Sequence, residues 1–218
     1  MERETMLSKL REPVNGLTHL GGAVLASLGL FVLLFTGRGG IAKNVSVLVY
    51  GLGLVGMFSA SAAYHLAKVQ PATLQTLRKI DHSSIFMLIA GTYTPFCLMA
   101  FTGFWRWGLL AIIWGIAVAG IAIKIFYINA PRWLNAATYI VMGWLCLIAA
   151  PQMPASLPPG ALLWLITGGV LYTLGAIIYA TRIFNFKPGI FGFHEVWHIF
   201  VLLGAAAQYI SILYLLLS

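Results

Sequence analysis

The chain has 218 residues, of which 61% are hydrophobic and 8% charged, with a formal net charge of +8 and a mean hydropathy of +0.93. Soluble domains carry about 25% charged and about 45–50% apolar residues, so one water-soluble core could not bury this much apolar surface. These numbers exclude a disordered chain, a collagen, a nucleic-acid binder and a disulfide scaffold, and they favour an integral membrane protein.

Seven apolar stretches are long enough to cross a bilayer as helices, which takes about 20 mostly apolar residues. In chain order they cover residues 17–35, 45–66, 82–101, 107–126, 134–150, 161–181 and 194–217. Continuous runs of this length do not fit a β-barrel, whose strands alternate in short segments. Because the linkers are short, we predict one all-α bundle over residues 1–218, in which residues 1–16 form a short cytoplasmic segment.

Lysine and arginine are unevenly divided between the two sides of this topology. Ten lie at the N-terminus or in alternate loops: Arg3, Lys9, Arg11, Lys68, Arg78, Lys79, Lys124, Arg132, Arg182 and Lys187. Three lie on the opposite side: Arg38, Lys43 and Arg106. Since cytoplasmic loops carry the excess of basic residues, the N-terminus is predicted in the cytoplasm and the C-terminus outside. The protein should therefore be a multi-pass cell-membrane protein, in a bacterium an inner-membrane protein.

Some features of the spans resemble functional motifs but are explained better by packing. The stretch 51–56 (GLGLVG) spells a dinucleotide-binding fingerprint, yet no strand precedes it and no acidic residue follows at the required distance. Small residues that allow close helix packing explain it better. Cys97 and Cys146 both lie in apolar runs, where packing is favoured over a disulfide bond. Pro95 inside the third span predicts a kink.

Ionisable groups inside membrane spans are costly and by default indicate a functional site. They fall into three short clusters: Ser61 and His65 at the end of span 2, Asp81 and His82 at the start of span 3, and His194, Glu195 and His198 at the start of span 7. The predicted topology puts all three at the cytoplasmic end. The spans and the charge count do not depend on these residues, so their common depth is independent support for a site.

The spacings within these clusters suit a metal ion. His194 and His198 are four residues apart and share one helix face. His65 would complete a set of three histidines, which is the protein half of a catalytic zinc site with an open fourth position. Asp81 could hold or deprotonate the water bound there. Ser61 lies one turn deeper than His65, roughly 5–6 Å, and could orient Asp81 or a ligand.

Two alternative interpretations remain open from the residues alone. A histidine near a membrane interface is often only an amphipathic side chain whose polar end is hydrated, with no role in binding. The run from His194 to His198 also spells the zinc-peptidase motif, in which Glu195 would be the general base. We favour Asp81 as the base, because no third peptidase ligand follows on that helix.

The combination of motifs along the chain resembles the haemolysin III family, the bacterial branch of the progestin and adipoQ receptor (PAQR) proteins. The residues that carry the resemblance are Glu12-x-x-Asn15-x-x-Thr18-His19, Ser61-x-x-x-His65, Asp81-His82, Gly91-Thr-Tyr-Thr-Pro-Phe96 and His194-x-x-x-His198. They extend over nearly the whole chain, and the span count and orientation agree with the family as well. The larger group also includes alkaline ceramidases.

The resemblance implies a seven-helix bundle with a zinc ion near the cytoplasmic face. His65, His194 and His198 match the zinc-binding histidines of the family, Asp81 its water-holding aspartate, and Ser61 its serine beside the metal site. Relatives act as lipid-amide hydrolases or as receptors with ceramidase-like activity, and bacterial members are linked to membrane lipid homeostasis. The expected ligand or substrate is therefore a membrane lipid.

Other residues of these motifs have no settled role. Glu12, Asn15 and His19 match family positions where the chain enters the membrane on the zinc side, and they could either hold span 1 or take part in catalysis. His82 directly follows Asp81 and points elsewhere on its helix, so it is left out of the ligand set. Glu195 is not part of the shared metal pattern, which weakens the peptidase interpretation.

Three functions are compared. The leading hypothesis is a zinc-dependent hydrolase of lipid amide or ester bonds, in which zinc polarises the carbonyl and Asp81 takes the proton. The second is a lipid sensor or receptor whose metal only ties the spans together. The third, a pore, transporter or lysin, ranks last, because a conduction path needs polar lining through the full bilayer depth. The sequence does not determine the oligomeric state.

Overall fold

The computed structural model of this protein describes residues 10–36, 40–187 and 190–218. Its helices are α1 (Pro13–Phe35), α2 (Ile41–Leu66), α3 (Pro71–Pro95), α4 (Gly103–Phe126), α5 (Arg132–Trp144), α6 (Met153–Ser156), α7 (Pro159–Thr181) and α8 (Phe193–Leu217). Residues 1–9 of the predicted N-terminal segment lie outside the described residues, and so does Arg38 of the predicted outer side.

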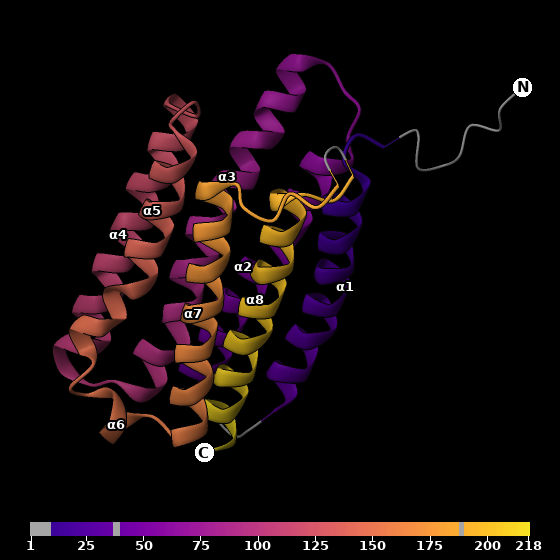
Figure 1. The fold of residues 1–218 in the computed structure, drawn as a ribbon. Helices are drawn as coiled ribbons and strands as arrows, with labels where there is room; N and C mark the ends of the chain where they lie inside the picture. Colours follow the sequence, from indigo (N-terminus) through magenta and orange to yellow (C-terminus); the bar gives the residue numbers. More distant parts are fainter. Residues whose placement is uncertain (1–9, 37–39, 188–189) are drawn as a thin grey trace, which may run out of the picture.

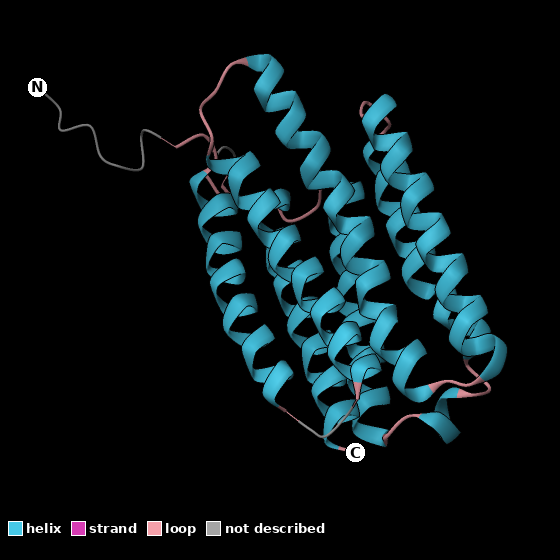
Figure 2. Cartoon of the chain, turned by 180° about the vertical axis from the view of Figure 1, so that it is seen from behind, coloured by secondary structure: helices cyan, strands magenta, loops and turns pink. Residues whose placement is uncertain are grey.

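Seven helices in the described ranges are long and apolar enough to cross a membrane. This confirms the predicted all-α membrane bundle, and the short α6 lies at one end of it (Figure 1). Because the number of crossings is odd, the start of α1 and the end of α8 lie at opposite ends of the bundle (Figure 2). The chain is a multi-pass membrane protein whose outer surface contacts lipid.

The third span differs most from its predicted bounds. Its helix begins at Pro71 rather than at residue 82, and it extends beyond its neighbours at one end of the bundle (Figure 1). Pro71 occupies the first helical turn, where its missing N–H has no cost. Half of residues 71–80 are polar, so a prediction from hydropathy begins the span at the apolar part, although the helix itself begins earlier. The first helix likewise begins at Pro13, inside the predicted 1–16 segment.

Two spans change their helix type near the end opposite the histidines. At Pro95, α3 passes into a π-helical turn, Phe96–Ala100, so the predicted kink site is a change of helix type. The second change is at the end of α5, which passes into a 3-10 turn, Leu145–Ala149. There Tyr93 Oη donates to the Gly143 carbonyl at 2.7 Å and accepts from the Cys146 amide at 2.7 Å. The Tyr93 hydroxyl thus satisfies backbone groups that the change of helix type releases.

The helices form a closed arrangement in which distant parts of the chain are neighbours. Helix α1 packs against α2 and α8, α3 packs against α2, α4 and α5, and α7 packs against α5 and α8. Figure 1 shows the first and last helices, α1 and α8, side by side. This arrangement brings the end of α2 and the start of α8 to the beginning of α1.

Small residues let α2 and α3 approach closely. A Cβ atom added to Gly53 would lie 3.4 Å from the Met87 carbonyl oxygen, and one added to Gly91 would lie 3.3 Å from the Val49 carbonyl oxygen. Stretch 51–56 is therefore part of a helix interface, as predicted. Cys97 and Cys146 are free thiols, which confirms that they form no disulfide bond with each other.

Candidate metal centre

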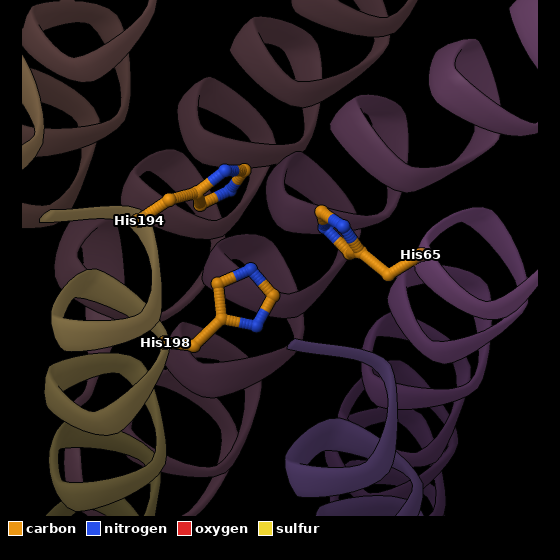
Figure 3. Close-up of side chains that lie close together, drawn as sticks. All are labelled: His65, His194 and His198. Carbon is orange, nitrogen blue, oxygen red and sulfur yellow. The ribbon is translucent and has the colours of Figure 1, made fainter. Parts of the chain in front are cut away.

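Three histidine side chains converge at one end of the bundle, which we call the histidine end. His65, His194 and His198 each offer a ring nitrogen, and these atoms all lie within 4.8 Å of one another. Figure 3 shows the three rings turned toward a common point, one from α2 and two from α8. Such a group could hold a metal ion.

Helix positions explain how the group forms. His65 lies in the last turn of α2, and His194 and His198 lie in the first two turns of α8. The start of α1 is tied to the end of α2 by backbone hydrogen bonds, from the Glu12 amide to the His65 carbonyl at 2.9 Å and from the Arg11 amide to the Leu66 carbonyl at 3.4 Å. The entry of the chain into the membrane is thereby fixed beside the histidines.

Glu12 is in direct contact with His65. Its carboxylate is hydrogen-bonded to His65 Nδ1, and its other oxygen lies 3.3 Å from the guanidinium of Arg11. Burial alone would raise the pKa of Glu12, but the hydrogen bond and charge of His65, together with Arg11, hold that pKa below its ordinary value. An ionised Glu12 favours the tautomer of His65 that carries its proton on Nδ1, and this would leave Nε2 free to bind a metal ion.

Replacing Glu12 with glutamine should therefore weaken metal binding without removing a ligand. The expected loss is about 10–100-fold in zinc affinity, because a carboxylate that orients a metal-binding histidine also raises its basicity. Competition with a chelator of known affinity measures the change. Unchanged affinity in Glu12→Gln would show that Glu12 only anchors the helix.

Glu195 makes hydrogen bonds that the zinc-peptidase motif does not predict. Its Oε2 accepts the backbone N–H of Gly192 at 2.7 Å, which caps the start of α8. Its Oε1 accepts Asn15 Nδ2 from α1 at 2.8 Å. With both carboxylate oxygens engaged, Glu195 joins α1 to α8.

His19 lies directly against the histidine group. Its ring stacks on that of His198 with centroids 3.9 Å apart and contacts Phe58 edge-on at 5.0 Å. His19 is buried, and neither ring nitrogen has a hydrogen-bond partner among the described residues. The stacking restricts the orientation of His198, so His19 holds that ring in place from the side of α1.

The two residues predicted to act beside the metal lie on the wall of the same cavity. Asp81 on α3 and Ser61 on α2 are both buried and line the cavity that the three histidines border. His82 lies there as well, with Nδ1 3.3 Å from Asp81 Oδ2. The structure therefore places Asp81 and Ser61 at the histidine end, on the cavity wall. They are not members of the group whose ligand atoms lie within 4.8 Å of one another, which consists of the three histidines.

The cavity is long and mainly apolar. It has a volume of about 450 Å³ and extends from Glu12 and the histidines to Phe101 and Leu157 at the opposite end of the bundle. Its middle is lined by apolar side chains, among them Met57, Ile85, Leu88, Ile89, Phe96 and Leu109. Volumes of about 300–1,000 Å³ are typical of sites for small organic ligands. The shape suits a molecule with a polar end at the histidines and a long apolar tail.

Comparison with known proteins shows the family of this chain. The model of the family described as haemolysin-III related matches residues 7–209. The chain belongs to the haemolysin III family. It is 36% identical to Hemolysin-3 of Bacillus cereus over 221 residues, which covers 100% of this chain and 96% of that protein.

Further relatives are found in bacteria and in animals. The Hemolysin-3 homolog of Bacillus subtilis (strain 168) is 36% identical over 211 residues, which covers 96% of both chains. The human monocyte to macrophage differentiation factor is 25% identical over 175 residues, which covers 78% of this chain and 70% of the human protein. The haemolysin III chain described here thus has relatives in both bacteria and animals, as its resemblance to the PAQR proteins implies.

Proposed function

We propose that this haemolysin III protein is a zinc-dependent hydrolase that cleaves an amide or ester bond of a membrane lipid and contributes to membrane lipid homeostasis. One observation carries the proposal. A group of three histidines lies at one end of a long apolar cavity inside a membrane bundle. A lipid could extend its tail along that cavity while a carbonyl near its head lies beside the histidines.

The donor set supports zinc as the metal. Three imidazoles without a thiolate are the protein ligands of catalytic zinc sites that keep a fourth position open. Glu12 supplies the outer carboxylate that orients one of the ligands, as in many histidine metal sites. His65, His194 and His198 would hold the ion.

The remaining residues would divide the chemistry between them. A bound zinc ion would polarise the lipid carbonyl and lower the pKa of water at the site. Asp81 would accept the proton of the attacking water and then pass it to the leaving amine or alcohol as the carbon–nitrogen or carbon–oxygen bond breaks. Ser61, one turn deeper than His65, would hold Asp81 or the carbonyl in position. The apolar walls would keep bulk water from the acyl chain.

Metal removal tests the proposal. Protein purified in detergent should contain about one zinc per chain by elemental mass spectrometry. It should release fatty acid from a ceramide or from a phosphatidylcholine, as measured by mass spectrometry of the products. Chelation should abolish the release and added zinc should restore it.

Two outcomes would contradict the hydrolase. Release of fatty acid that persists in metal-free protein would show that the histidine group is not needed for turnover. Full zinc content without turnover of either amide or ester lipids would favour a metal-stabilised lipid sensor or receptor.

A further inference from the structure

Gln208 is a polar side chain far from the histidines that still borders the cavity. It lies on α8, is 6% exposed, and contributes to the cavity wall. Its Nε2 donates to the Leu165 carbonyl of α7 at 3.2 Å. Its Oε1 has no hydrogen-bond partner in the described part of the chain. One acceptor of a buried amide is therefore left open beside an apolar space.

The described residues around this buried amide leave room for it, and none of them donates a hydrogen bond to its oxygen. A Cβ atom added to Gly168 of α7 would lie 2.5 Å from Gln208 Nε2, so the glycine leaves the room that the side chain needs. The indole of Trp144, which borders the same cavity, already donates to Thr173 Oγ1 at 2.9 Å. A buried acceptor without a donor is costly, because it gives up its hydrogen bonds to water and gains none in return, and one inside a membrane span calls for an explanation.

The position of Gln208 relative to the metal centre defines what could reach it. Gln208 follows His198 by ten residues on one helix, an axial rise of about 15 Å, which is roughly the length of an extended twelve-carbon chain. Gln208 also borders a side cavity of about 230 Å³ between α5 and α7, which shares Gly143 and Trp144 with the main cavity. The two cavities together leave space beside Gln208 for an oxygen substituent on an acyl chain in the main cavity.

We propose that Gln208 forms a hydrogen-bonding subsite for an acyl chain that carries a hydroxyl group near its middle. The hydroxyl donates to Gln208 Oε1 while the carboxyl-derived end lies at the histidines. The preferred ligand class is a mid-chain hydroxylated fatty acyl group. The inference rests on the proposed function only in taking the cavity as an acyl-chain site, and it holds for binding whether or not turnover occurs.

Binding of free fatty acids to metal-free protein tests the subsite apart from hydrolysis. The probes are stearic acid and its 12-hydroxy, 12-oxo and 3-hydroxy derivatives, with affinities measured by displacement of a fluorescent fatty acid. The wild type should bind 12-hydroxystearic acid about fivefold more tightly than stearic acid, the effect of one added hydrogen bond. The 12-oxo acid, which cannot donate, and the 3-hydroxy acid, whose hydroxyl lies at the histidines, should show no such gain.

The Gln208→Leu variant should lose the preference for the 12-hydroxy acid and keep its affinity for stearic acid. Gln152→Leu, an exposed glutamine outside both cavities, is the matched control and should keep the preference. Equal binding of the hydroxylated and plain acids by the wild type would overturn the subsite, and so would a preference that persists in Gln208→Leu. If that variant does not fold, the 12-hydroxy and 12-oxo acids still decide the question in the wild type.

Discussion

His198→Ala should remove the metal from the purified protein. His198 is buried and supplies one of three ring nitrogens within 4.8 Å of one another, so its loss leaves only two ligands on two helices. Zinc content should fall from about one per chain to a small fraction of that. At free zinc about 100-fold above its Kd, binding stabilises the folded state by about 2.7 kcal/mol. The wild type should therefore show a lower Tm after chelation, and the variant should show no change.

The matched control for this experiment is His82→Ala. His82 borders the same cavity but is not a member of the histidine group, so its variant should keep both the zinc and the chelation-dependent change in Tm. Comparing each protein with and without chelator cancels the packing cost of removing a side chain. Retention of stoichiometric zinc by His198→Ala would refute the assignment of the three ligands.

Asp81→Asn should separate metal binding from turnover. The amide keeps the size of the carboxylate but cannot take a proton, so kcat should fall by about 10²–10⁴. Zinc content should stay at the wild-type value, because Asp81 lies on the cavity wall outside the three-histidine group. Steady-state kinetics on whichever lipid the wild type hydrolyses, together with metal analysis of the same samples, measure both quantities.

Glu195→Gln is the matched carboxylate variant. Glu195 caps α8 and binds Asn15, so its change should lower stability modestly and leave kcat within about one order of magnitude. The reverse result, with turnover lost in Glu195→Gln and kept in Asp81→Asn, would assign the base to the peptidase-like motif instead.

The spans were predictable because a helix that crosses lipid must bury about 20 residues in hydrocarbon, and that requirement is visible in composition alone. The first turns of α3 were not, because helix beyond the hydrocarbon has no hydropathy signature. Hydropathy likewise could not predict that α3 would pass into a π-helical turn after Pro95. That change depends on which backbone groups find new partners.

The meeting of the candidate ligands was also predictable, since the order and direction of the spans alone bring His65 and His194 to one depth. The contacts of Glu12 and Glu195 were not, because the first depends on the start of α1 lying beside α2 and the second on α1 packing beside α8. Asn15 and Glu195 are 180 positions apart, and no local pattern encodes such a pair. Gln208 was missed because one glutamine in a long apolar run hardly changes its hydropathy. The feature that could have drawn attention to Gln208 is a polar side chain in the middle of a membrane span, where an apolar side chain would be more stable.

The division of the histidine group between α2 and α8 has a consequence for biogenesis. His65 and its partner Glu12 are synthesised early, whereas His194 and His198 belong to the last span to enter the membrane. A chain that is still being inserted therefore holds one of the three imidazoles of the group, and an ion held by all three could bind only after the final helix is in place. Loading of an ion would then be a late event, and a chain truncated before residue 194 would lack two of the three histidines that could hold it.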